Sequence, residues 1–159
     1  AVEYRAEGVD IDTAADCLLE GRHNMCQVFT VDNLKYLKKG GRITPAAAAL
    51  GSMLNLKPVL QLQGEKLDSF AQVRGRKKSI ELMAEQYDRY VEHAECETIG
   101  IAHGDCPEDA EALIALLNRN HPPKNIINAC YEPMTGAHVG PGALALFFYG
   151  KKEFRQATK

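Results

Sequence analysis

The sequence lacks the features that mark several protein classes. No apolar run approaches the roughly 20 residues that a membrane-spanning helix needs. The 19 Lys and Arg residues nearly balance the 21 Asp and Glu residues, and the net charge of −2 argues against a general nucleic-acid binder. The first residues, AVEYRAEGVDID, hold no basic stretch followed by an apolar one, so they predict no secretory signal.

Cysteine is present, but in a pattern that does not suit disulfides. The five cysteines, at positions 17, 26, 96, 106 and 130, are odd in number and irregularly spaced. A disulfide framework would need an even set. We therefore expect free thiols that act as small hydrophobic side chains in a reducing, cytoplasmic compartment.

The motifs of common catalytic sites are also missing. There is no G-x-S-x-G, P-loop or H-E-x-x-H pattern, and no serine or cysteine has the context of a nucleophile. His103, Asp105 and Cys106, with Cys96 upstream, are metal-binding residue types, but their spacing matches no closed zinc pattern. The sequence thus predicts no catalytic residue, no metal site and no cofactor.

The chain has the size and patterning of one domain, residues 1–159, and 45% of its residues are hydrophobic. Strands are expected at 25–31, 56–63, 66–73, 96–104, 124–133 and 143–150, and helices at 12–22, 32–41, 44–55, 74–94 and 107–120. Hairpins mix with strand-helix-strand units. We therefore expect an α/β protein of the α+β type, with a six-stranded, mainly antiparallel sheet flanked by helices.

Local signals refine several of these elements. Asp10 or Asp12 is expected to cap the helix over 12–22, with Leu18 and Leu19 inward, and Asp32 to cap the helix over 32–41. In the long helix, apolar residues recur every three or four positions, at Ile80, Met83, Tyr87, Tyr90 and Val91. The opening AVEYRAEG reads as the tail of a helix that ends at Gly8, so we expect the chain to begin inside a larger protein.

The stretch GAHVGPGA, residues 136–143, places His138 among three glycines and a proline. Such a chain adopts conformations that most residues avoid, and it allows a ligand to approach the backbone. The histidine could act as a base, a metal ligand or a ligand clamp. It could equally belong to a turn entering a strand, with its imidazole bound to a nearby carbonyl, and from the residues alone the turn is favoured.

Two basic segments have similar alternatives. In LKKGGRITP, Arg42 lies two residues before an expected helix start, which suits a carboxylate or phosphate, whereas the alanines that follow suit close helix packing. The segment RGRKK, residues 74–78, opens the long helix. It is either a solvated helix start or a docking patch for an acidic partner.

Taken together, VDNLKYLKKGGRI, LGSMLNLKPVLQL, VRGRKK, IAHGD and GAHVGPGALALFFYG resemble the carboxy-terminal domain of the DegV family from residue 9 to 150. The resemblance implies a six-stranded, mainly antiparallel domain that is normally joined to an amino-terminal parallel-sheet domain, which we expect to be absent from this chain. It also implies the binding subunit of a bacterial fatty acid kinase. Such a subunit holds a long-chain fatty acid in a tunnel, and a separate ATP-dependent kinase converts the carboxylate into an acyl-phosphate for phospholipid synthesis.

The same resemblance assigns residues. His138 of the HVGPG motif is expected to bind the carboxylate, and Arg42 to lie near the head group or the mouth that faces the kinase. Ala137 departs from the family, in which threonine is common before the histidine, and Thr44, Pro45 and Ala46 also differ. The expected tunnel lining is Phe29, Ile43, Leu50, Met53, Leu54 and Leu146, and the expected kinase-docking residues are Arg74, Arg76 and Lys77.

The resulting prediction is a lipid-binding carrier that is not itself an enzyme, with a fatty acid as its ligand and no cofactor. One alternative is an enzyme in which His138 acts as base or nucleophile on a small substrate, although no second member of an acid-base pair is visible. Another is a purely structural domain with adventitious lipid.

Overall fold

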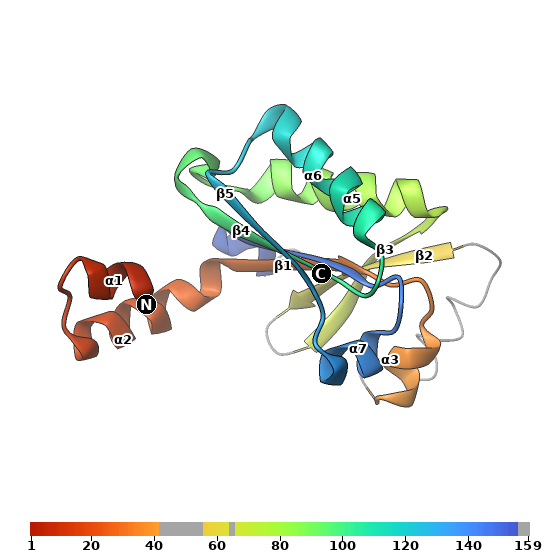
Figure 1. The fold of residues 1–159 in the computed structure, drawn as a ribbon, viewed down its shortest axis with the longest axis horizontal. Coiled ribbons are helices and arrows are strands. Elements are labelled where there is room, and N and C mark those ends of the chain that lie inside the picture. Colours follow the sequence, from red (N-terminus) through yellow and green to blue (C-terminus); the bar gives the residue numbers. More distant parts are fainter. Residues whose placement is uncertain (42–55, 64–65, 156–159) are drawn as a thin grey trace.

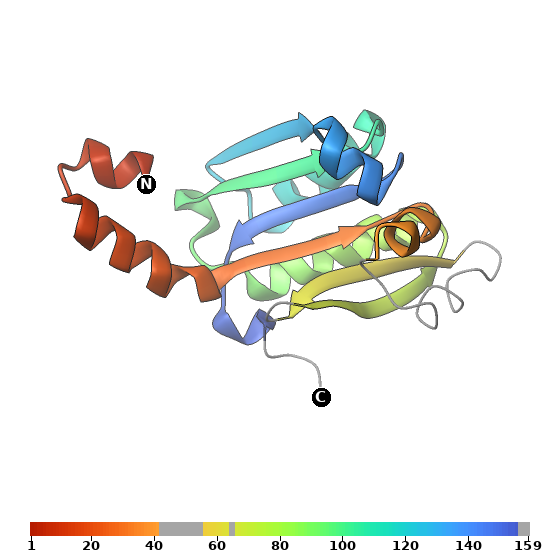
Figure 2. The ribbon, with the colours of Figure 1, turned by 90° about the horizontal axis from the view of Figure 1, so that it is seen from below.

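The computed structural model describes residues 1–41, 56–63 and 66–155. Its centre is one six-stranded sheet, seen nearly edge-on in Figure 1 and from its face in Figure 2, with the order β3-β2-β1-β6-β4-β5. The strands are β1 (Met25–Thr30), β2 (Leu56–Gln63), β3 (Lys66–Arg74), β4 (Thr98–His103), β5 (Asn125–Cys130) and β6 (Leu144–Tyr149). Neighbouring strands run antiparallel except β4 and β5, which are parallel. The predicted fold class is confirmed.

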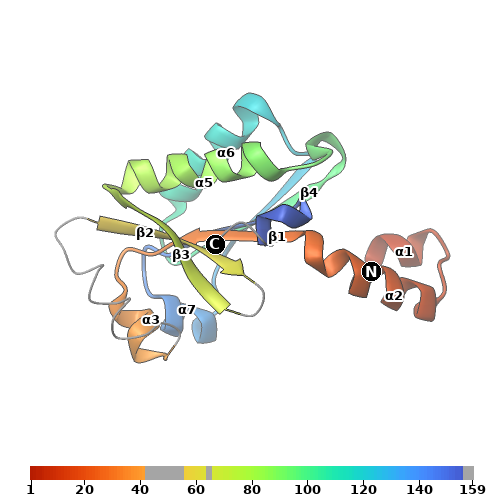
Figure 3. The same cartoon turned by 180° about the vertical axis from the view of Figure 1, so that it is seen from behind.

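Two helices cover one face of the sheet and enclose the main core. They are α5 (Arg76–Tyr90) and α6 (Pro107–Asn120), which lie side by side (Figure 3). The predicted periodicity of α5 is confirmed, because Ile80, Met83, Tyr87 and Tyr90 are all buried. Tyr87 packs edge-on against Phe148 of β6, with ring centres 5.2 Å apart, and so joins the helix to the sheet.

The opposite face carries a smaller apolar cluster near one end of the sheet. It is covered there by α3 (Lys35–Lys39) and α7 (Pro133–Val139) (Figures 1 and 3). Its buried members are Val31, Leu34, Leu37, Leu60 and Ala143, with Phe29, Tyr131 and Val139 packed against them. The two faces alternate along β1, where Val28 belongs to the main core and Phe29 to this second cluster.

The amino-terminal helices project away from the sheet (Figure 2). They are α1 (Val2–Ala6) and α2 (Ile11–Gly21), and neither buries a side chain. Asp10 caps α2 as predicted, since its carboxylate accepts hydrogen bonds from the backbone of Asp12 and Thr13 at 3.1 and 3.0 Å. The inward orientation predicted for Leu18 and Leu19 is wrong, because they are 49% and 57% exposed and α2 has no core beside it.

Three other local predictions have mixed outcomes. Asp32 does not cap α3, because its carboxylate pairs with Lys57 of β2 at 2.7 Å; the first turn of α3 uses the Asn33 side chain instead. The predicted helix over 44–55 lies outside the described residues. All five cysteines lie in the described part as free thiols, but only Cys26 and Cys106 are buried, so the predicted hydrophobic role fits these two alone. Among the helices of the described ranges, none is both long and apolar enough to span a membrane.

Candidate functional site

Two sequence motifs that are almost 100 residues apart meet between α3 and α7. Gly40 ends α3, and the half-buried imidazole of His138 lies directly against it. A Cβ at position 40 would stand 2.7 Å from His138 Nδ1, closer than side chains approach one another. Gly40 of LKKGGRI therefore makes the space that the His138 imidazole occupies, and this imidazole makes no hydrogen bond to any residue of the described ranges.

Helix α7 orients this histidine. Glu132 and Pro133 start the helix, because the Glu132 carboxylate accepts hydrogen bonds from the backbone of Met134 at 2.6 Å and Thr135 at 2.8 Å. Hydrogen bonds from the Thr135 side chain and backbone lower the pKa of Glu132, and the nearby His138 lowers it further. His138 therefore stands in the last turn of a helix. The turn-before-strand interpretation is wrong for His138, since the turn comes only after it, at Gly140, whose φ is +79°.

The loop after His138 is held by close contacts that only glycine allows. A Cβ on Gly140 would collide with the ring of Tyr36 on α3, and one on Gly142 would stand 2.8 Å from Asp32 Cβ. Gly104 donates a backbone hydrogen bond to Ala143 at 2.7 Å, and Gly142 donates one to Gly104 at 2.7 Å. The segments that follow β1 and β4 are thus joined to the segment before β6, at the end of the sheet where His138 lies.

Next to this junction, one row of facing residues across the sheet is apolar, and its side chains become smaller toward β5. Across the strands, Leu60 pairs with Phe29, Phe29 with Ala145, Ala145 with Ala102 and Ala102 with Ala129. Phe29 and Leu60 belong to the cluster on the face of α3 and α7. Because facing residues of neighbouring strands lie on one side of a sheet, the three alanines share that face. It offers apolar contact next to His138.

The predicted lining residues divide between the two faces. Phe29 lies on the same face as His138, whereas Leu146 is fully buried in the main core beneath α5 and α6. The structure does not bring these two side chains together. Four further predicted lining residues, Ile43, Leu50, Met53 and Leu54, lie outside the described residues, as does Arg42.

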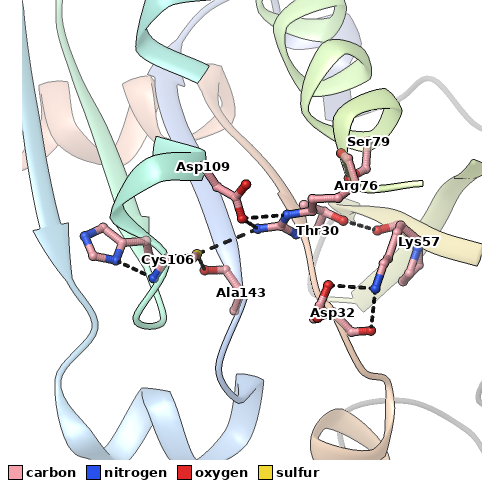
Figure 4. Close-up of polar contacts among 10 residues, drawn as sticks. Thr30, Asp32, Lys57, Arg76, Ser79, Cys106, Asp109 and Ala143 are labelled. Carbon is pink, nitrogen blue, oxygen red and sulfur yellow. Dashed lines mark hydrogen bonds and ion pairs between the residues drawn. The ribbon is translucent and has the colours of Figure 1, made fainter. Parts of the chain in front are cut away.

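The three predicted docking residues have different surroundings. Arg74 is exposed at the end of β3, and Lys77 is exposed on α5. Arg76 already binds partners within the chain. Its Nε and Nη2 both lie 2.9 Å from the Asp109 carboxylate, and Nη2 lies 3.7 Å from Cys106 Sγ (Figure 4). Cys106 in turn donates to the Ala143 carbonyl at 3.4 Å (Figure 4). Arg76 therefore connects α5 to the loop that follows His138.

Two of the residues considered for a metal, His103 and Cys106, take part in hydrogen bonds within the fold. His103 Nδ1 accepts a hydrogen bond from the Cys106 backbone at 3.3 Å, at the start of α6. In the described ranges, no three His, Cys, Asp or Glu side chains gather as metal ligands would.

Burial and a nearby Cys106 raise the pKa of Tyr131 to about 12, so this phenol beside the second cluster stays neutral.

Sequence reasoning missed several residues that shape this site. Tyr36 and Gly104 were not singled out, because their contacts join segments that are distant in the chain. Ala102 and Ala145 were read only as parts of strands, and their position beside Phe29 depends on strand order and register. One missed feature did have a local signal: Glu132 followed by Pro133 is a typical start of a helix.

Comparison with known proteins gives consistent matches. Residues 1–151 match the family described as "Uncharacterised protein, DegV family". A DegV domain-containing protein of Clostridium perfringens is 38% identical over 151 residues, which cover 94% of this chain and 52% of the relative. The chain spans about half the length of the curated relatives it matches.

Solved structures agree in fold. One is a DegV family protein of Thermus thermophilus for which fatty acid binding is described. It superposes with a TM-score of 0.83 at 27% identity, over 94% of this chain and 54% of that one. The fatty acid kinase B3 protein of Streptococcus pneumoniae, loaded with linoleic acid, gives 0.84 at 15% identity, over 94% and 53%; at that identity the likeness concerns the fold. On the strength of the match over residues 1–151, this chain belongs to the DegV family.

Proposed function

We propose that this chain is the lipid-binding part of a cytoplasmic fatty-acid carrier, which presents the carboxylate of a bound long-chain fatty acid to a separate ATP-dependent kinase. The observation that carries the proposal is the meeting of His138 with Gly40 beside an apolar sheet face. The fatty acid binding described for relatives of the same fold supports it. His138 is the carboxylate ligand in this proposal, and Arg42 adds positive charge nearby.

The chemistry of a fatty acid requires both parts of such a site. About fifteen methylenes at about 0.8 kcal/mol each give roughly 12 kcal/mol of gross transfer free energy on burial. Ordering the flexible acyl chain and losing its free motion oppose much of this gain. The carboxylate must also keep hydrogen bonds where it leaves water, or its desolvation would prevent binding. An imidazole held at the edge of an apolar face meets both needs.

The proposed path of the acyl chain follows the face of α3 and α7. Phe29 and Ala102 are part-exposed on this face, on either side of the buried Ala145, so alkyl carbons could contact them without displacing the main core. The small side chains leave more room above the sheet than leucines would. Leu146 supports this face from behind, because it belongs to the core on the other side of β6.

A carrier role also fits the surroundings of His138. A histidine that acts as a general base is normally oriented by a hydrogen-bonded acid. The His138 imidazole has no such partner within the described ranges, and the carboxylate of the nearby Glu132 is occupied by the start of α7. The imidazole is therefore free to donate to an incoming carboxylate.

The test is lipid binding by the full-length protein. Mass spectrometry of the purified, denatured protein should find one acyl chain per molecule. His138→Ala should weaken fatty-acid binding about 10- to 100-fold, the effect of losing a hydrogen bond to a charged group worth about 1.5–3 kcal/mol. His121→Ala, at an exposed histidine elsewhere, is the matched control. A protein that is always empty, or a His138→Ala protein that binds as well as wild type, would refute the proposal.

A further inference from the structure

The outer side of the helix layer carries a groove that the site above does not use. It lies between α5 and α6, has a volume of about 560 Å³, and is separated from the second cluster by the sheet. Its apolar surface comes from Ile80, Ala112, Ala115 and Leu116. Ala112 and Ala115 are exposed and one helical turn apart, so no large side chain of α6 fills this part of the groove.

Positive charge surrounds this apolar surface. The lining residues include three cations, Arg76, Lys77 and Arg119, and two carboxylates. Both carboxylates already have partners, since Asp109 binds Arg76 at 2.9 Å and Glu81 binds Lys78 at 3.3 Å. Lys77 and Arg119 are exposed and form no ion pair or hydrogen bond with any described residue. The charge left without a partner along the groove is therefore positive.

One end of the groove is connected to the His138 site. Arg76 lines the groove and contacts Cys106 Sγ at 3.7 Å. Cys106 bonds to the carbonyl of Ala143, in the loop that follows His138 (Figure 4). One end of the groove therefore lies at the end of the sheet where the carboxylate is proposed to bind, with the sheet between them.

We propose that this groove binds an acidic, amphipathic helix of the kinase that acts on the carboxylate. The inference rests on the proposed carrier function. Apolar side chains of the incoming helix pack on Ala112, Ala115 and Leu116, because small residues let a helix approach closely. Its acidic residues pair with Lys77 and Arg119 at the two sides. This proposal revises the set of predicted docking residues. Lys77 remains in it and Arg119 is added, whereas Arg76 joins the two helices through its pair with Asp109.

The test uses the full-length protein and its purified kinase, with affinity measured by biolayer interferometry and bound acyl chain by mass spectrometry. Ala115→Trp fills the groove, and Lys77→Glu with Arg119→Glu reverses its charge. Each should weaken kinase binding about tenfold or more while the acyl chain content stays unchanged. Lys124→Glu with Lys151→Glu, a matched reversal of two exposed lysines outside the groove, should bind as wild type does.

A photo-reactive p-benzoylphenylalanine in place of Ala112 identifies the occupant. A cross-link to an acidic, amphipathic helical segment of the kinase supports the proposal. A cross-link to a second copy of this chain, a cross-link to a basic kinase segment, unchanged affinity in both groove variants, or no kinase binding by the wild-type protein would overturn it. Absence of an acyl chain from wild-type protein would instead count against the carrier function, and the affinities and cross-links would still judge the groove.

Discussion

Adjacent glycines at positions 40 and 41 allow the proposed carboxylate site at His138 to be perturbed without removing the histidine. Gly40 has a φ of −77°, which alanine adopts readily, but a Cβ there would lie 2.7 Å from His138 Nδ1. Gly41 has a φ of +68°, which alanine avoids, but a Cβ there would meet nothing within 4 Å. The same substitution should therefore have opposite effects at the two positions.

The size of each effect follows from these contacts. In Gly40→Ala the imidazole must move by about 0.7 Å to reach the ordinary contact distance of 3.4 Å. Hydrogen bonds of this kind span only about 2.7–3.2 Å, so such a shift is enough to lose one. The loss should cost about 1.5–3 kcal/mol of fatty-acid binding, roughly tenfold or more in affinity. The free energy of unfolding should change by less than about 1 kcal/mol, because the backbone conformation suits alanine.

Gly41→Ala should show the reverse pattern. The left-handed backbone costs a non-glycine residue about 1–2 kcal/mol, which should lower the free energy of unfolding, while His138 and fatty-acid affinity stay unchanged. Urea denaturation measures the first quantity, and titration with a fluorescent fatty acid measures the second. Wild-type affinity in Gly40→Ala, or equal affinity losses in both variants, would refute the idea that Gly40 makes room for the carboxylate ligand.

Three further predictions concern the frame around the site. Gly140→Ala should lower the free energy of unfolding by roughly 2–4 kcal/mol in urea denaturation, because its Cβ would meet the Tyr36 ring and φ is +79°. Adding Tyr36→Ala should recover part of this loss, and no recovery would contradict the contact. Arg76→Ala should lower the free energy of unfolding by about 1–2 kcal/mol, and a double-mutant cycle with Asp109→Ala should show coupling between the two side chains. Strict additivity of the two losses would mean that the pair adds no stability. Thr135→Ala should raise the pKa of Glu132 in an NMR titration. Because the folded-state pKa is depressed, the stability from this cap is present above the ordinary glutamate pKa and is lost as pH falls through the folded value. An unchanged pKa in the Thr135→Ala protein would contradict the contribution of the Thr135 hydroxyl.

Local chemistry allowed much of the fold to be predicted. Helix α6 begins and ends at the predicted residues, because Pro107 and two acidic residues mark its start and its apolar spacing continues to Asn120. The strand β2 also has its predicted bounds. These elements depend on neighbours within a few residues, which the sequence displays directly.

Errors arose where the partner of a residue is distant in the chain. Asp32 has the residue type and position of a helix cap, but Lys57 of β2 lies close enough to bind it instead. Leu18 and Leu19 have the spacing of a buried helix face, but no element of the described ranges covers α2. Pattern alone gives the side of a helix that is apolar, and it does not give the surface against which that side lies.

By itself, the sequence determined the family, the six strands and the apolar periodicity of α5, and it predicted a ligand-binding role for His138, which the lipid binding of His138→Ala tests. Tertiary structure decided that His138 stands at the end of a helix and not in a turn, that Gly40 makes room for it, and that Phe29 and Leu146 lie on opposite faces of the sheet. The physical reason is that periodicity and capping act over a few residues. The contacts of a site depend on strand order and register, which bring residues 40, 104 and 138 to one end of the sheet.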